Sequence, residues 1–148
     1  MRRSFDLHHV VTFEETNLVG NVYFTNYFLW QGQCREMFLH EHAPQTLASL
    51  RAGELRLVTA HASCDFADEF AAFDPVCVRM SLNRYIPFGL SLNFEYGRQA
   101  RPAPGTQGGG FEVVARGRQD IKFLHREGAN WMLFEIPREL MEVLRQYE

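Results

Sequence analysis

The sequence is short of several features that mark whole classes of protein. It has a single lysine, Lys122, and a formal net charge of -3 over 148 residues. Proteins that bind nucleic acids usually carry a basic excess, so this balance argues against a nucleic-acid partner. No apolar run approaches the roughly 18 residues that a membrane-spanning helix needs. We therefore expect neither nucleic acid nor a membrane as a partner.

Cysteine is also scarce, with Cys34, Cys64 and Cys77 as the three in the chain. An odd number without CxxC spacing favours free thiols in a reducing compartment over a disulfide framework. The residues after the N-terminal Met1-Arg2-Arg3 do not form the apolar segment of a signal peptide. These features together predict a cytoplasmic protein.

What remains is an ordinary globular composition, with 46% hydrophobic and 22% charged residues. A chain of this length suits one domain with a real core, and we expect that domain to span residues 1–148. The 13 phenylalanines are many for this length. They indicate either a plain aromatic core or a cavity lined with rings.

The first third of the chain predicts a strand followed by a long helix. Residues 4–13 show loose alternation and predict a strand. Residues 25–42 carry an apolar stripe at helical spacing, formed by Tyr27, Trp30, Cys34, Met37 and Phe38. Ala43-Pro44 should end this helix. Residues 45–56 are expected to form a surface connection with a short helical piece.

From Leu57 onward the pattern changes to strands, predicted at 57–66, 76–82, 90–96 and 111–124. Pro87-Phe88-Gly89 should end the strand that begins at residue 76. Residues 102–110 should form a hairpin loop, and residues 138–147 a terminal helix. One helix against an antiparallel sheet is an α+β architecture. A lone sheet of this kind leaves an edge and an apolar face uncovered, so we expect a homo-oligomer.

The chemically informative residues lie in one window: Asn17, Gly20, Tyr23, Asn26, Tyr27 and Arg35. A strand ends, a tight glycine turn follows, and a helix begins with aromatic residues. This string resembles the signature of the 4-hydroxybenzoyl-CoA thioesterase-like branch of the hot-dog superfamily. The resemblance implies a single hot-dog domain, in which an antiparallel five-stranded sheet wraps around one long central helix. It also implies dimers that join edge to edge, and often tetramers.

The departures from that signature are informative. Members of this branch usually carry aspartate where this chain has Asn17, and many carry glutamate where it has Gly32. A histidine that often precedes the helix is replaced by Phe24. An amide cannot act as a general base or nucleophile near neutrality. The resemblance therefore leaves Asn17 to orient a carbonyl or a water, beside the backbone N–H of Phe24 at the helix N-terminus.

Each candidate also has a purely structural interpretation. Asn17 could cap its own loop, and Tyr27 could either bond a substrate carbonyl or simply pack with its hydroxyl satisfied. Arg35 lies just over two helical turns after Tyr27, so both can lie near one stripe. Its guanidinium could stabilise an enolate or oxyanion. It could instead form an ion pair with Glu14 or Glu15.

Other residue types give weaker signals. His40 and His42 face different ways on a helix, so we expect no metal and no cofactor. Cys34 has no histidine at a convincing position and is not expected to be a nucleophile. Glu36 lies about 100° around the helix from Arg35 and should face outward or a subunit contact.

A hot-dog thioesterase without its carboxylate needs an easily cleaved substrate, and a β-keto thioester is one. With Asn17, Tyr27 and Arg35 at these places, the chain resembles the thioesterases that serve enediyne polyketide synthases. The resemblance implies a β-keto polyene acyl chain on the phosphopantetheine of an acyl carrier protein, and a product acid that can decarboxylate to a methyl ketone. A set of arginines could meet that acidic carrier or be scattered surface charge: Arg84, Arg98, Arg101, Arg116 and Arg118. The rivals are a general acyl-CoA thioesterase that uses another carboxylate and a non-catalytic acyl-binding protein.

Overall fold

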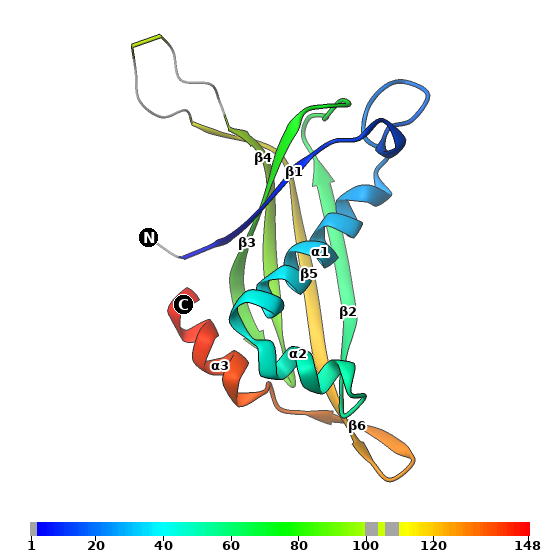
Figure 1. Ribbon diagram of the computed structural model, residues 1–148, viewed down its shortest axis with the longest axis vertical. Coiled ribbons are helices and arrows are strands. Elements are labelled where there is room, and N and C mark those ends of the chain that lie inside the picture. Colours follow the sequence, from blue (N-terminus) through cyan, green and yellow to red (C-terminus); the bar gives the residue numbers. More distant parts are fainter. Residues whose placement is uncertain (1–2, 100–103, 106–109) are drawn as a thin grey trace.

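The computed structural model describes residues 3–99, 104–105 and 110–148. One long helix lies against a curled sheet, and two short helices lie near one end of it (Figure 1). The strands are β1 (Phe5–Val10), β2 (Leu55–Phe66), β3 (Pro75–Ile86), β4 (Gly89–Gln99), β5 (Phe111–Glu127) and β6 (Asn130–Phe134). The helices are α1 (Thr25–His42), α2 (Pro44–Arg51) and α3 (Arg138–Leu144), with 3-10 turns η1 (Phe13–Glu15) and η2 (Arg145–Tyr147).

The sheet has the strand order β1-β3-β4-β5-β2, and every neighbouring pair is antiparallel. The predicted α+β architecture, with antiparallel strands curled around one long helix, is confirmed (Figure 1). This order leaves β1 and β2 at the two edges of the main sheet.

A sixth strand was not predicted. β5 continues past Leu124 to Glu127, and the chain reverses through Gly128 and Ala129 into β6, which pairs with the end of β5. Gly128 has a φ of 60°, a conformation that glycine adopts without strain. A glycine at the first position of a two-residue turn is a known hairpin signal, and it was missed here.

The boundaries predicted for α1 are confirmed at both ends. Ala43 caps the helix with a φ of -137°, and Pro44 begins α2. Of the predicted stripe, Tyr27, Trp30, Cys34 and Phe38 are buried against the sheet. Met37 is 38% exposed, so its inclusion was wrong: it lies at the margin of the buried face.

The strand boundaries differ from the predictions in ways that have local causes. β1 ends at Val10 rather than residue 13, because Thr12 and Glu15 form a capping box that starts η1. β3 and β4 run to within two residues of each other and reverse through Pro87 and Phe88. The terminal helix is confirmed as α3 followed by η2. The hairpin loop predicted at 102–110 falls mostly outside the described residues.

Within the described part of the chain, no helix has both the length and the apolar character needed to cross a membrane.

Candidate active site

The segment before the helix is anchored by Glu15. Its Oε1 accepts the backbone N–H of Thr12 at 2.8 Å and lies 2.7 Å from Nε2 of His9. Its Oε2 accepts the indole N–H of Trp30 at 2.9 Å, and its carbonyl accepts the side-chain amide of Asn26 at 2.9 Å. Burial acts to raise the pKa of Glu15, but these hydrogen bonds outweigh burial and leave its pKa lowered. Glu15 therefore ties β1, the following loop and the first turns of α1 together.

Asn17 begins a tight turn directly after the segment that Glu15 anchors. Its backbone N–H donates to the carbonyl of Asn21 at 2.9 Å, and its carbonyl accepts the N–H of Gly20 at 3.0 Å. Gly20 has a φ of 89°, which explains the glycine. The side-chain Oδ1 of Asn17 accepts the N–H of Val19 at 3.0 Å. The side-chain oxygen of Asn17 thus caps its own loop, as one of the two interpretations predicted. The side-chain NH2 of Asn17 has no hydrogen-bond partner among the described residues.

Phe24 stands at the N-terminal end of α1. The N–H groups of Asn26 and Tyr27 bond back to the carbonyls of Tyr23 and Phe24 at 3.0 and 3.2 Å. Within the described residues, the N–H groups of Phe24 and Thr25 have no hydrogen-bond partner. A helix N-terminus with free N–H groups favours developing negative charge.

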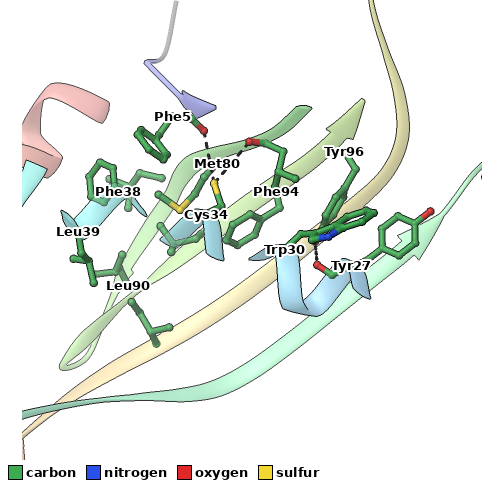
Figure 2. Packing of buried hydrophobic residues seen from close by; sticks show 14 of the residues in the cluster. Phe5, Tyr27, Trp30, Cys34, Phe38, Leu39, Met80, Leu90, Phe94 and Tyr96 are labelled. Carbon is green, nitrogen blue, oxygen red and sulfur yellow. Dashed lines mark hydrogen bonds between the residues drawn. The ribbon is translucent and has the colours of Figure 1, made fainter. Parts of the chain in front are cut away.

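Tyr27 lies in a cluster of aromatic rings (Figure 2). Its ring centroid is 4.8 Å from that of Phe66, 5.2 Å from that of Tyr96 and 5.3 Å from that of Trp30. The hydroxyl of Tyr96 donates to the carbonyl of Tyr27 at 2.7 Å. Burial raises the pKa of Tyr27 to about 12, so its hydroxyl stays protonated at neutral pH and can donate a hydrogen bond.

A pocket of about 220 Å³ brings three of the predicted residues together: Asn17, Phe24 and Tyr27. Two acidic residues from the β2–β3 connection, Asp68 and Glu69, line the same pocket. Neither residue was predicted from the sequence as part of the site. The available signal was an acidic pair next to an apolar residue, Phe70, which is fully buried.

Arg35 is placed apart from these residues. It lies two turns further along α1, about 12 Å at 1.5 Å per residue. Its Nη1 donates to Oε1 of Gln119 at 2.7 Å and to the hydroxyl of Thr59 at 3.2 Å. The alternative ion pair with Glu14 or Glu15 is absent among the described residues, and Glu15 is held by His9 and Trp30 instead.

The guanidinium of Arg35 is only partly satisfied. Its Nε is buried and has no hydrogen-bond partner in the described part of the chain. Burial lowers the pKa of Arg35, while the neighbouring Glu36 acts in the opposite direction. The side chain borders a small apolar cavity, lined also by Phe38, Leu39, Met80, Leu90, Leu92, Ile121, Leu140 and Leu144.

The buried side-chain amides of Gln119 and Gln31 continue the hydrogen bonding of Arg35 toward the N-terminal half of α1. Nε2 of Gln119 donates to Oε1 of Gln31 at 3.4 Å, and Nε2 of Gln31 donates to the carbonyl of Ser63 at 3.1 Å. Gln31 is fully buried and Gln119 is 5% exposed. These two amides were not predicted as site residues, because nothing in the local pattern distinguishes them from surface glutamines.

Cys34 packs in the core (Figure 2), and burial raises the pKa of its thiol to about 12. This environment disfavours the thiolate that a nucleophile requires. The side chains of Asp6, His8 and Cys77 place potential metal-ligand atoms within 4.8 Å of one another, a cluster that sequence spacing did not reveal. Both oxygens of Asp6 already accept hydrogen bonds from Arg79, at 3.0 and 3.1 Å.

Known relatives of this chain are found among solved structures. No family profile matches the chain, and no curated protein sequence matches it. Among solved structures, the dynemicin thioesterase is 43% identical, with a TM-score of 0.86 over 98% of this chain and 97% of that one. Its crystal structures describe induced-fit and allosteric effects upon polyene binding.

Two more distant structures share the fold. An aspartate-to-asparagine mutant of 4-hydroxybenzoyl-CoA thioesterase, in complex with 4-hydroxybenzoyl-CoA, is 16% identical, with a TM-score of 0.78 over 96% of this chain and 99% of that one. The 1,4-dihydroxy-2-naphthoyl-CoA thioesterase from Synechocystis is 15% identical, with a TM-score of 0.77 over 97% and 96% of the two chains.

The chain belongs to the family of the dynemicin thioesterase and is a thioester hydrolase, with a hot-dog fold that it shares with the 4-hydroxybenzoyl-CoA thioesterases. Within that family it is similar to the dynemicin thioesterase, and the predicted association with the enediyne branch is confirmed.

Proposed function

We propose that this protein hydrolyses a β-keto polyene acyl thioester on the acyl carrier protein of an iterative, enediyne-type polyketide synthase. The observation that carries the proposal is the donor set of the Asn17 pocket. Asn17, Phe24 and Tyr27 line one pocket and can offer it an amide NH2 that is unpaired among the described residues, a backbone N–H and a hydroxyl, and no carboxylate occupies position 17. The similarity to a thioesterase whose structures describe polyene binding supports the same substrate class.

The chemistry suits such a substrate. A second carbonyl makes the thioester carbonyl more electrophilic, so the reaction depends less on a strong nucleophile at position 17. The donors would stabilise the oxyanion that forms when water adds to the thioester carbon. Cleavage of the C–S bond releases the carrier thiol and a β-keto acid, which can then lose CO2 to give a methyl ketone.

Arg35 has a defined place in this proposal. Its unpartnered Nε marks a position where a ligand oxygen would complete the hydrogen bonding of a buried cation. The apolar cavity beside it would receive part of the polyene. That cavity is nearly filled, at about 10 Å³, so the surrounding side chains must move to admit a chain.

A second copy of the chain is the proposed partner in assembly. Large apolar side chains are exposed around the Asn17 pocket: Phe13, Leu18, Val19, Tyr23, Phe24, Phe66 and Phe73. Burying them against another copy would remove this surface from water. We propose a dimer or tetramer, with residues 1–148 as one hot-dog domain acting in the cytoplasm.

The carrier protein is proposed as the other partner. Of the five arginines suggested to meet it, Arg98, Arg116 and Arg118 form ion pairs with this chain's own carboxylates, and Arg101 lies outside the described residues. Arg84 is exposed and has no ion-pair partner among the described residues. A docking surface built on arginines would therefore centre on Arg84.

The proposal is tested by mass spectrometry of carrier proteins loaded with a β-keto acyl chain or with a saturated chain of equal length. We expect release of the β-keto acid and its methyl ketone, with the saturated chain left on the carrier. Equal release of both chains would instead identify a general acyl thioesterase. Binding of both without release would identify an acyl-binding protein.

A further inference from the structure

The β2–β3 connection, residues 67–74, places Glu69 in the lining of the Asn17 pocket, on a firmly held backbone. The N–H groups of Ala67 and Asp68 both donate to the carbonyl of Val114 at 3.0 Å. On the other side of Glu69, the carbonyl of Phe70 accepts the N–H of Val22 at 2.9 Å. Glu69 is thus held between two attachments, one to the sheet and one to the segment that leads into α1.

Arg98 strengthens that attachment. Its guanidinium donates to the backbone carbonyl of Glu69 and lies 5.3 Å from the centre of the Phe70 ring. It also forms an ion pair with Asp68 at 3.3 Å. The positive charge of Arg98 is therefore directed at the backbone, at Asp68 and at Glu112, which it also pairs with at 3.3 Å, and no bond joins it to the Glu69 carboxylate.

The two carboxylates of this connection have different surroundings. Both oxygens of Asp68 are engaged, one by Arg98 and the other by the backbone N–H of Glu69 at 2.8 Å. These hydrogen bonds lower the pKa of Asp68 and make it a poor proton acceptor. The carboxylate of Glu69 has neither a hydrogen bond nor an ion pair among the described residues. Its charge also acts to raise the pKa of Tyr27, after the larger effects of burial and Cys64, which raise it, and of the Phe70 backbone, which lowers it.

We propose that Glu69 is the general base of the hydrolysis and replaces the carboxylate that is absent at position 17. This rests on the Asn17 pocket being the reactive site, as proposed above. A water beside Glu69 loses a proton to the Glu69 carboxylate while its oxygen bonds to the thioester carbon. The carbonyl oxygen becomes an oxyanion that accepts hydrogen bonds from the NH2 of Asn17 and the N–H of Phe24. When the carbonyl re-forms, the C–S bond breaks, and the departing thiolate takes the proton back from Glu69.

The test compares water with hydroxylamine, a nucleophile strong enough to need little help from a base. Glu69→Gln keeps the size of the side chain but removes its basicity. We expect kcat for hydrolysis to fall by about 10²–10⁴-fold, the usual contribution of general base catalysis, with little change in KM. Cleavage by hydroxylamine should be retained. Glu69→Asp should recover part of the hydrolysis, and formate should restore part of the activity of Glu69→Ala.

A matched control is Glu112→Gln, which neutralises another carboxylate paired with Arg98 but outside the pocket. It should hydrolyse at the unaltered rate. Unchanged hydrolysis by Glu69→Gln would overturn the proposal. Equal losses with water and hydroxylamine would overturn it too, because a misplaced substrate would slow both reactions alike.

Asn17→Ala separates this inference from the proposed function. If Asn17→Ala loses hydrolysis and Glu69→Gln does not, only the role of Glu69 fails. If neither variant loses hydrolysis, the pocket itself is wrong and both proposals fail. If Glu69→Gln loses hydrolysis but β-keto and saturated chains react equally, the base is supported and the substrate class is not.

Discussion

The indole N–H of Trp30 donates to the carboxylate of Glu15 at 2.9 Å, across fifteen residues of sequence. Trp30 is fully buried on α1, and Glu15 ends the 3-10 turn that precedes the Asn17 loop. The loop that carries the candidate active site is therefore positioned by a hydrogen bond to the core face of the central helix. Stability of the fold and geometry of the site are coupled through this one carboxylate.

Replacing Glu15 should consequently destabilise the protein. Glu15→Ala leaves the buried indole N–H of Trp30 without an acceptor, which costs about 1–3 kcal/mol of unfolding free energy. Urea denaturation followed by tryptophan fluorescence measures this loss. An unchanged unfolding midpoint would show that the hydrogen bond is not a support of the fold.

The same carboxylate predicts a pH dependence of stability. The folded-state pKa of Glu15 is lowered from its usual value of 4.5. Its contribution is thus fully present above pH 4.5 and is lost as the pH falls through the lower folded-state value. Melting temperatures should show Glu15→Gln less stable than the parent at pH 7, with the gap narrowing below pH 4.5. A gap that does not narrow would contradict the lowered pKa.

Two glycines should respond in opposite ways to alanine. A Cβ at Gly89 would collide with the backbone carbonyl of Ile121 on β5, so Gly89→Ala should cost about 1–3 kcal/mol. A Cβ at Gly32 on α1 would meet no atom within 4 Å. Gly32→Ala should therefore stabilise the helix by about 0.5–1 kcal/mol. Urea unfolding of the two variants side by side measures both, and equal shifts would contradict the close strand approach at Gly89.

Asn17→Ala should lower kcat by about 10²–10³-fold, the usual effect of removing one oxyanion donor. Asn17→Asp keeps the oxygen that accepts the N–H of Val19, so we expect it to retain the fold and part of the turnover. Steady-state kinetics with a β-keto thioester and a circular dichroism melt distinguish the two. Full turnover by Asn17→Ala would leave Asn17 as a loop cap only.

Arg35→Ala should depress kcat for β-keto thioesters far more than for saturated ones, because only the former present a second oxygen. Arg35→Lys should rescue poorly, since an ammonium lacks the fork that can grip two oxygens. Arg138→Ala removes an arginine with a 93% exposed side chain from α3 and serves as the control. It should leave kcat for both substrates and the melting temperature unchanged. Equal losses on both substrates with a lowered melting temperature would remove Arg35 from the mechanism.

The oligomer prediction is checked by light scattering at micromolar concentration, where we expect a dimer or tetramer. Leu18 is fully exposed beside the candidate pocket, and Leu18→Asp should shift the protein toward monomer. Met132→Asp introduces the same charge at a 48% exposed methionine on β6, at the other end of the sheet, and should leave the assembly intact. A stable monomer for the parent protein would contradict the argument from uncovered apolar surface.

Local features of the sequence were sufficient for the central elements. The helical stripe and the Ala43-Pro44 stop define α1, because helix periodicity and capping depend on neighbours a few residues apart. Alternation located the four later strands of the predicted sheet for the same reason. The Asn17-to-Arg35 window indicated the family, since its turn glycine and helix start are adjacent in the chain.

Only the tertiary structure decided which distant residues share a pocket. Asn17 and Glu69 are 52 positions apart, and strand register together with the path of the β2–β3 connection brings them together. Register depends on pairing across the whole sheet, which local alternation does not determine. For the same reason the sequence left two partners open for Arg35, a carboxylate of this chain or a substrate oxygen. In the fold, the Nη1 of Arg35 donates a hydrogen bond to Gln119, 84 positions away.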